Sequence, residues 1–171
     1  MGVNENDVRV FTDSDWAGCL DSRKSTSGGM MCFGGGLVKS WATTQASIAL
    51  SVGEAEFYAG IKGAAEAIGF CNLLRDLGIE AKVKLWTDSN TAKSMASKTG
   101  AGSARHIDTR YYWIKDVVKK GVVHLFKIDG KDNPSDLLTK PQSITEIIRR
   151  GGTVGLRLKT KGGIKIRDDV A

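Results

Sequence analysis

The chain is poor in cysteine and has no long apolar run, and each shortage excludes a class of protein. Its three cysteines, Cys19, Cys32 and Cys71, lie far apart without a Cys-x-x-Cys pair, so neither a disulfide framework nor a cysteine zinc site is expected. No segment approaches the roughly 20 apolar residues of a membrane-spanning helix. The first ten residues contain no apolar signal region. We therefore expect an intracellular protein that does not bind membranes.

Charge is distributed unevenly along the chain, whose formal net charge is +6. Residues 149–171 contain seven Lys or Arg side chains and two Asp, whereas the preceding part is nearly balanced. A basic tail with several glycines suits a polyanionic partner, and it is equally typical of a solvated linker. With 171 residues, of which 41% are apolar, the chain is expected to form one domain over residues 1–148 and a flexible tail over residues 149–171.

Five segments have the alternating or continuous apolar pattern of β-strands. They span residues 8–13, 29–33, 37–41, 83–87 and 122–128. Three consecutive glycines between the second and third segments, Gly34 to Gly36, are typical of a hairpin turn. The first three strands are therefore expected to be antiparallel.

Helical periodicity separates the later strands. The longest helix is predicted over residues 52–77, where Ser51 and Glu54 have the spacing of a capping box and Gly78 follows as a stop. Shorter helices are predicted over residues 90–97, 107–120, 134–139 and 143–150. Strands connected through helices pair in parallel, so an α/β fold is expected: a mixed five-stranded sheet (three antiparallel strands, then parallel strands) flanked by helices.

The apolar side chains that face inward in this arrangement form the predicted core. They are Val8, Val10, Met31, Phe33, Val38, Tyr58, Ile61, Ala65, Ile68, Leu74, Leu85, Ile114, Val117, Leu125 and Leu137. Most of them belong to the strands and to the long helix, which is expected to cover the sheet.

Acidic residues follow two of the predicted strands at corresponding places. The first strand ends at Asp13 and the fourth is followed by Asp88, each within a Thr-Asp-Ser sequence. If these strands are parallel neighbours, both carboxylates lie at one edge of the sheet. The long helix brings Glu54 or Glu56 there, but not both, because residues two apart on a helix face nearly opposite directions. The helix over residues 134–139 adds Asp136.

Four carboxylates at one edge would repel one another and raise one another's pKa unless cations bound them. Two divalent ions about 3.5–4 Å apart would neutralise this charge and align a water molecule and a leaving oxygen at a phosphodiester. Oxygen ligands without His or Cys favour Mg²⁺, with Mn²⁺ as a substitute. Structural roles are the alternative, since Asp88-Ser89 can cap the next helix and Asp136 can favour a helix dipole.

Six segments stand out in the order FTDSDWAG, DSRKSTSGG, KSWATTQASIALSVGEAEFYA, LWTDSNTA, RHIDTRYYWIKD and KDNPSDLLTKP. Together, from Val8 to Pro141, they resemble the ribonuclease H domain of copia-type LTR retrotransposon Pol polyproteins. The resemblance implies a ribonuclease H-like fold and a two-metal hydrolase that cuts the RNA strand of an RNA/DNA hybrid during reverse transcription, leaving a 5′-phosphate. It implies catalytic and metal-binding roles for Asp13, Glu56, Asp88 and Asp136.

The resemblance also implies a cellular setting. The expected partners are an RNA/DNA hybrid and the reverse transcriptase region of the same polyprotein, and the isolated domain is expected to be monomeric. The expected location is the cytoplasm, within a virus-like particle, and also the nucleus.

Two features depart from the pattern of cellular ribonucleases H. Those enzymes carry a His in the loop before the last carboxylate, whereas the corresponding loop here, residues 130–133, has none. His124 lies within the fifth strand and is interpreted as a strand residue. Some members also have a basic helical handle, for which residues 98–104 are too short.

Contacts with the hybrid must then come from other segments. The residues expected to make them are Arg23, Lys24, Ser25, Thr26, Lys39, Trp41, Ser89, Asn90, Arg105 and His106. Exposed Arg and Lys side chains are usually only solvated, and Trp41 is equally suited to a core. Recognition is expected to rest on groove shape, phosphates and 2′-hydroxyl groups, with little sequence preference, and the basic tail should add salt-sensitive affinity.

Two other functions fit parts of the pattern. One is a catalytically weak or inactive nucleic-acid-binding module of the same fold. The presence of all four acids argues against it, whereas the missing loop His leaves room for low activity. An integrase-like strand transferase is a third reading, which the order of the carboxylates and the hairpin-rich start fit less well.

Overall fold

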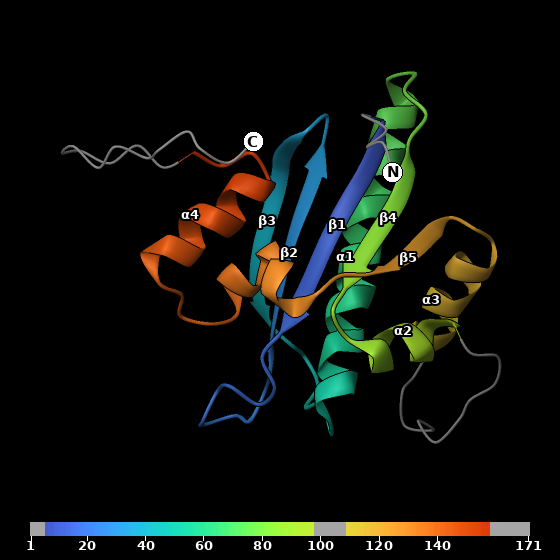
Figure 1. Ribbon diagram of the computed structural model, residues 1–171. Coiled ribbons are helices and arrows are strands. Elements are labelled where there is room, and N and C mark those ends of the chain that lie inside the picture. Colours follow the sequence, from blue (N-terminus) through green and yellow to red (C-terminus); the bar gives the residue numbers. More distant parts are fainter. Residues whose placement is uncertain (1–5, 98–108, 158–171) are drawn as a thin grey trace, which may run out of the picture.

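A computed structural model of the chain describes residues 6–97 and 109–157 and shows a single twisted sheet between two layers of helices (Figure 1). The strands are β1 (Asp7–Ser14), β2 (Thr26–Phe33), β3 (Gly36–Thr44), β4 (Lys82–Thr87) and β5 (Val123–Lys127). Their order in the sheet is β3-β2-β1-β4-β5. The first three strands pair antiparallel, whereas β4 is parallel to both β1 and β5. The predicted mixed five-stranded sheet is confirmed.

Helices cover both faces of this sheet. They are α1 (Val52–Asp76), α2 (Asn90–Ser97), α3 (Thr109–Lys119) and α4 (Ile144–Thr153), with the short 3-10 helices η1 (Gly130–Asp132) and η2 (Pro134–Leu138). In Figure 1, α1 runs behind the sheet, and η2 and α4 lie in front of it. No helix in the described part of the chain is both long enough and apolar enough to cross a membrane.

The turn between β2 and β3 has the conformation that its glycines predicted. Gly34 and Gly35 have φ angles of 57° and 82°, in the left-handed region that residues with side chains rarely adopt. Gly36 already begins β3. The expected hairpin is confirmed.

Two further glycines in β2 allow close approach on opposite faces of the sheet. A Cβ atom on Gly28 would lie 2.7 Å from Thr139 Cγ2 and 3.1 Å from the carbonyl O of Ser135, so its absence lets the η2 segment lie against β2. A Cβ atom on Gly29 would lie 2.1 Å from the ring of Trp41, the residue paired with it on β3. Gly28 is paired with Asp13 on β1, so this packing also fixes the surroundings of the first acidic residue.

The start of α1 matches its sequence signals. Ser51 Oγ accepts a hydrogen bond from the backbone N–H of Glu54 at 3.2 Å, which caps the helix as expected. Glu54 Oε2 in turn accepts from the backbone N–H of Leu50 at 3.0 Å, one residue before the cap. Glu54 therefore serves the helix start, and its neighbour Glu56 is free to face the sheet.

The apolar core is divided by the sheet into two clusters. The larger one lies beneath α1 and includes Val8, Val10, Met31, Trp41, Phe57, Leu74, Leu85 and Ile114. The smaller one lies beneath η2 and α4 and includes Phe11, Met30, Cys32 and Val154. Six of the predicted core residues are buried and seven more pack against the clusters while partly exposed.

The predicted burial of Val38 and Ala65 is wrong. Val38 is 46% exposed because the pairing of β2 with β3 shifts between Met31 and Cys32, which leaves Val38 without a partner across the strands. Ala65 is exposed because the buried face of α1 passes through its neighbours Ala64 and Ala67 instead.

The end of the described chain differs from the expectation in two ways. The segment after Asn133-Pro134 is a 3-10 helix that ends at Leu138 rather than an α-helix. The last helix, α4, continues through Gly151 and Gly152 to Thr153, past the boundary expected after residue 148. Val154 follows it and is completely buried. The first residues of the predicted tail therefore pack on the sheet.

Candidate active site

Three acidic side chains meet at the end of the sheet where β1 and β4 finish. Asp13, Glu56 and Asp88 each offer a carboxylate oxygen, and these oxygens all lie within 4.8 Å of one another. Asp13 is 1% exposed and Glu56 is 5% exposed. The structure thus brings together three of the four acids predicted to form the site.

The pairing of the strands explains why Asp13 and Asp88 are neighbours. Thr12 on β1 lies opposite Thr87 on β4 in the parallel pair, and each is followed directly by its acid. The two Thr-Asp-Ser sequences therefore end at the same level of the sheet.

Glu56 reaches this edge from the second turn of α1 and is held there by β1. Its Oε1 atom accepts hydrogen bonds from both the backbone N–H and the hydroxyl of Ser14, each at 3.1 Å. Ser14 directly follows Asp13, so the same strand end supplies one acid and positions another. These bonds give the physical reason why Glu56, rather than Glu54, joins the site.

Burial and mutual repulsion make the three-acid cluster electrostatically unfavourable when it holds no cation. Desolvation, followed by the charges of Asp13 and Asp88, raises the pKa of Glu56 to about 8. Desolvation also raises the pKa of Asp13 to about 6, although the hydrogen bond from Thr139 and the charge of Lys140 oppose the rise. Both carboxyl groups are thus less acidic than exposed ones.

One carboxylate oxygen of the cluster has neither a hydrogen-bond donor nor a cation beside it among the described residues. Glu56 Oε2 is buried and receives no hydrogen bond from any described residue. A buried carboxylate oxygen is costly without a donor or a cation. Three converging carboxylates without His or Cys form an oxygen-only set, which fits a hard divalent cation.

Asp136, the fourth predicted acid, lies beside the cluster but in a different environment. Its Oδ1 is 2.7 Å from the ammonium Nζ of Lys140, and that Nζ is 3.6 Å from Asp13 Oδ2. Its Oδ2 accepts from Arg150 Nη1 at 2.8 Å. Burial alone would raise the pKa of Asp136, but the hydrogen bond and charge of Lys140, with the charge of Arg150, lower it. Lys140 therefore bridges the cluster and the fourth acid.

Arg150 is the functional residue that sequence reasoning missed. Its side chain is 8% exposed and donates to Asp136, to Glu146 Oε2 at 2.9 Å and to the carbonyl O of Asn133 at 2.8 Å. It thus fastens α4 to the segment that carries the fourth acid. A signal was present, because Glu146 and Arg150 have the i,i+4 spacing of a helical ion pair and Ser143 has the spacing of a cap for Glu146.

Two polar side chains attach the η2 segment to β1. Asn133 is fully buried, and its Nδ2 donates to the carbonyl O of Thr12 at 2.9 Å while its Oδ1 accepts from the N–H of Ser135 at 3.2 Å. The hydroxyl of Thr139 donates to Asp13 Oδ2. Asn133 thus caps the η2 segment and also links it to the strand.

The loop after β5 approaches Asp88 closely without a histidine. A Cβ atom on Gly130 would lie 3.0 Å from Asp88 Oδ2, and Lys127 Nζ donates to the carbonyl O of Asp88. His124 pairs with Lys84 near the other end of β5. It is a strand residue, as expected.

Two of the residues expected to contact nucleic acid are buried, and this corrects the prediction. Ser25 has no exposed surface, and its hydroxyl accepts from the backbone N–H of Ala17 at 3.0 Å. Trp41 is 9% exposed and packs over Gly29 in the larger core cluster. Ser25 therefore cannot meet a phosphate, and most of the Trp41 ring is buried in the core.

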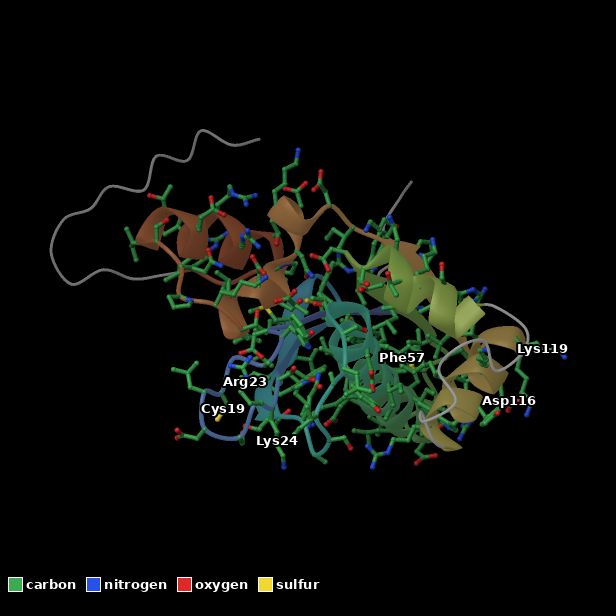
Figure 2. All side chains as sticks on the ribbon, turned by 90° about the horizontal axis from the view of Figure 1, so that it is seen from below. Cys19, Arg23, Lys24, Phe57, Asp116 and Lys119 are labelled. Atoms are coloured by element: carbon green, nitrogen blue, oxygen red, sulfur yellow. The ribbon has the colours of Figure 1, made fainter. Side chains whose placement is uncertain are left out.

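The other predicted contacts have varied environments. Arg23 and Lys24, labelled in Figure 2, belong to the loop between β1 and β2, which extends beyond the end of β1 in Figure 1. Thr26 is partly buried at the start of β2, and Lys39 forms an ion pair with Glu66 at 2.6 Å.

At α2, Ser89 Oγ accepts from the backbone N–H of Ala92 at 3.0 Å and so caps the helix, while Asn90 is exposed as its first residue. The cap anticipated for Ser89 is confirmed. Arg105 and His106 lie outside the described residues, so their predicted contacts remain predictions.

Sequence comparison finds relatives among transposon proteins. No family model matches the chain. The chain is 36% identical over 143 residues, or 82% of its length, to the retrovirus-related Pol polyprotein from transposon TNT 1-94 of Nicotiana tabacum. It is 27% identical over 143 residues to the corresponding polyprotein from transposon RE2 of Arabidopsis thaliana. The chain spans only 11% and 10% of these relatives.

Solved structures with the same fold are ribonucleases H. LC11-RNase H1, isolated from compost by a metagenomic approach, matches 78% of this chain and 92% of its own with a TM-score of 0.58 and 16% identity. The complex of LC11-RNase H1 with an RNA/DNA hybrid matches with a TM-score of 0.54 and 14% identity, covering 77% of this chain and 93% of its own. The foamy viral protease-reverse transcriptase, also in complex with an RNA/DNA hybrid, matches 81% of this chain and 20% of its own with a TM-score of 0.51 and 13% identity.

The two kinds of comparison agree with the geometry of the sheet. Sequence relatives cover most of the chain, and the structural likeness shows the fold. The chain therefore belongs, over most of its length, with the retrovirus-related Pol polyproteins of plant transposons, and it adopts the ribonuclease H fold.

Proposed function

We propose that this domain is a metal-dependent endonuclease that hydrolyses the RNA strand of RNA/DNA hybrids during retrotransposon reverse transcription. The convergence of Asp13, Glu56 and Asp88, with Glu56 Oε2 buried and unpaired among the described residues, carries the proposal. An arrangement that is unfavourable alone and favourable around cations is typical of a metal-dependent site.

Each residue has a distinct part in the proposed reaction. When bound, divalent ions supply Lewis-acid stabilisation of the phosphodiester and of the attacking water. Asp13 and Asp88, from adjacent strand ends, would hold the ions, and the hydrogen bonds of Ser14 to Oε1 leave Glu56 Oε2 available to them. Hydrolysis breaks the bond between phosphorus and the 3′-oxygen, leaving a 5′-phosphate and a 3′-hydroxyl. We assign Mg²⁺ as the ion, with Mn²⁺ as a substitute.

Lys140 and Asp136 form the second half of the proposed centre. The Lys140 ammonium lies between Asp13 and Asp136 and its side chain is 50% exposed, so it is available to an incoming phosphate. Asp136 is kept ionised by Lys140 and Arg150. In the proposed reaction, Asp136 completes the acidic set and orients Lys140.

The proposed substrate rests on relatives and on the exposed loop beside the acids. LC11-RNase H1 and the foamy viral enzyme, which share the fold, are bound to RNA/DNA hybrids in their solved structures. The sequence relatives are Pol polyproteins, which supports the reverse transcriptase region of the same polyprotein as a further partner. Arg23 and Lys24 on the projecting loop are suited to backbone phosphates (Figure 2).

Cleavage assays with three duplexes test this function. Labelled RNA/DNA hybrid, duplex DNA and duplex RNA are incubated with Mg²⁺ and either the wild-type chain, Asp88→Asn or the control Asp116→Asn. Asp116 is an exposed acid on α3 paired with Lys120, far from the cluster in sequence and fold. We expect cleavage of the hybrid alone, reduced at least about 100-fold in Asp88→Asn and unchanged in Asp116→Asn.

A non-catalytic nucleic-acid-binding module is the second candidate. Asp136 is already engaged by Arg150 and Lys140, and the loop beside Asp88 has no His, which together favour low activity. Binding of the hybrid without cleavage, in both Mg²⁺ and Mn²⁺, would select this candidate. Cutting or joining of duplex DNA would indicate a strand transferase instead.

A further inference from the structure

Trp16 lies three residues beyond Asp13, and the proposed reaction does not use it. Its side chain is 51% exposed, although Trp is highly buried on average. The indole Nε1–H donates to the carbonyl O of Ala49 at 3.1 Å. Because this nitrogen is the only polar atom of the ring, the exposed half of Trp16 is mainly hydrocarbon.

The turn that carries Trp16 is fixed on both sides of the residue. Asp15 donates its backbone N–H to Thr26 O at 3.2 Å, and its carboxylate accepts from the N–H of Thr26. Ala17 donates to the buried hydroxyl of Ser25 and has a φ angle of 53°, a conformation that costs energy for a residue with a side chain. The ring is therefore presented by a pre-organised turn.

Other large apolar side chains are also exposed on segments at the acid-bearing end of the sheet. Four more large apolar side chains are exposed on the β1–β2 loop, the β3–α1 connection and the first residue of α1. They are Leu20 (80% exposed), Ile48 (52%), Leu50 (67%) and Val52 (54%). Together with Trp16 we call them the apolar rim. The β1–β2 loop extends beyond the end of β1 in Figure 1, and Cys19, Arg23 and Lys24 of this loop are labelled in Figure 2.

We propose that Trp16 packs against nucleotide sugars of the bound hybrid and thereby positions the phosphate that is cleaved. The inference rests on the proposed function, since it assigns a substrate contact of the same site. Three residues of chain span at most about 10 Å. Nucleotides follow one another at about 3.4 Å along a duplex. Trp16 therefore lies within about three nucleotides of the phosphate held at Asp13.

The geometry of a duplex favours sugars over bases as the surface that Trp16 meets. Bases in a duplex are stacked on one another and present only their edges, whereas the wide, shallow minor groove of an A-form-like helix displays its sugars. An aromatic face gains contact there without any base preference. This accounts for exposed hydrocarbon next to an acidic centre, which phosphate contacts alone would not require.

Binding measurements in a non-cleaving background test the contact. Each variant is combined with Asp88→Asn, and its affinity for a labelled RNA/DNA hybrid is measured by fluorescence anisotropy over a series of salt concentrations. We expect Trp16→Ala to weaken binding about tenfold, because the apolar surface of the ring is no longer buried against the hybrid. The salt slope should stay unchanged because no charge is removed. Leu77→Ala, which alters a side chain 68% exposed just beyond the other end of α1, is the matched control and should bind like the parent.

The variant Trp16→Phe distinguishes a lost contact with the hybrid from a failure of the variant to fold. Phenylalanine keeps an aromatic face, so we expect nearly parental affinity, whereas the quenching of intrinsic tryptophan fluorescence by the hybrid should be largely lost. Circular dichroism and thermal melting establish that both Trp16 variants are folded. Quenching in Trp16→Phe equal to that of the parent would overturn the proposal even if Trp16→Ala did not fold.

The remaining outcomes distinguish this proposal from the proposed function. If wild type binds the hybrid without cutting it and Trp16→Ala binds about tenfold more weakly, the contact of Trp16 with the hybrid stands, whereas the positioning of a cleaved phosphate and the nuclease function both fail. If wild type cuts the hybrid and Trp16→Ala binds and cuts it equally well at the same positions, the positioning role fails and the function stands. The second result would assign the apolar rim to a protein partner.

Discussion

The acidic centre has two halves, one around Glu56 and one around Asp136, and the pKa values of their carboxyl groups shift in opposite directions because the second half contains Lys and Arg partners. Around Glu56, carboxylates face one another and the pKa values of Glu56 and Asp13 rise to about 8 and about 6. Around Asp136, the chain supplies its own cations, and the pKa of that acid falls. In the proposed reaction the first half is neutralised by cations from solution, whereas the second is neutralised by side chains of the fold itself. Asp13 belongs to both, because Lys140 lies 3.6 Å from it.

The two halves are carried by different layers of the fold. The cation-dependent half is built from β1, β4 and α1, the elements that also form the larger core cluster. The self-neutralised half is built from η2 and α4, which pack on the other face. Variants in each half should therefore respond differently to divalent ions and to pH.

Replacing Glu56 by Gln removes a carboxylate from the cation-dependent half and should produce the largest change in stability. The pKa of Glu56 is raised from 4.5 to about 8 in the folded protein. In the presence of a chelator, the free energy of unfolding of the wild type therefore falls as the pH rises from about 4.5 to about 8. Below pH 4.5 the side chain is protonated in both the folded and the unfolded state, so it causes no loss of stability. Glu56→Gln should remove about 2–5 kcal/mol of that loss. Divalent ions should stabilise wild type far more than the variant. Thermal melts at pH 5 and pH 8.5, with EDTA and with Mg²⁺, measure both effects.

The same melts contain the result that would contradict this prediction. A wild type whose melting temperature in EDTA is equal at pH 5 and pH 8.5 would show that Glu56 does not titrate as a buried acid. Glu54→Gln is the matched control, since Glu54 accepts from the backbone of Leu50 at the helix start rather than facing the cluster.

Replacing Arg150 by Met should break the self-neutralised half. The change leaves Asp136 without its buried partner and should cost about 3 kcal/mol of unfolding free energy. Arg149→Met is the control on the same helix, because Arg149 is 42% exposed and its ion pairs lie at the surface; we expect less than about 1 kcal/mol. Urea unfolding with a chelator present measures both. Equal losses in the two variants would refute the role of Arg150.

Replacing Gly28 by Ala should push the two halves apart. The added methyl group would meet Thr139 and the carbonyl O of Ser135, so η2 must shift from β2, at a cost of about 1–3 kcal/mol. Gly69→Ala in α1 adds the same group where no atom lies within 4 Å, and it should stabilise by up to about 1 kcal/mol. Guanidinium unfolding compares the two. A Gly28→Ala variant as stable as wild type would mean that η2 does not pack closely there.

Replacing Lys140 by Met should change the pKa of Asp13 and the affinity for Mn²⁺ with little change in stability. Because Lys140 is 50% exposed, its loss should alter the unfolding free energy by less than about 1 kcal/mol. Its charge lowers the pKa of Asp13, so the variant should raise that pKa. Calorimetric titration with Mn²⁺ at pH 8, where Asp13 stays ionised, should show tighter binding, because a competing cation is gone. Weaker binding would mean that Lys140 supports the metal site.

Much of the fold could be predicted because its signals are local. The Gly34–Gly36 turn, the Ser51 cap and the two Thr-Asp-Ser strand ends are read within a few residues, and each is where it was expected. Errors arose where a long-range contact decided the outcome. A shift in strand pairing exposes Val38, and the glycine across the hairpin allows Trp41 to lie in the core.

The acidic centre shows the same division between local and long-range information. The residues alone left Glu54 and Glu56 open, and resemblance selected Glu56. The hydrogen bonds from Ser14, 42 residues away in sequence, show why the structure agrees. Arg150 was placed in a tail, because nothing near it in sequence indicates that its guanidinium would be buried against Asp136.

The sequence by itself determined the elements, their order and the acids at the two strand ends, because backbone geometry and side-chain periodicity act over short stretches. Only the tertiary structure decided which acids would converge on one another and which would be paired with Lys and Arg. Electrostatic energy depends on distance and burial in space, and residues as far apart as Asp13 and Lys140 acquire both only when the chain is folded.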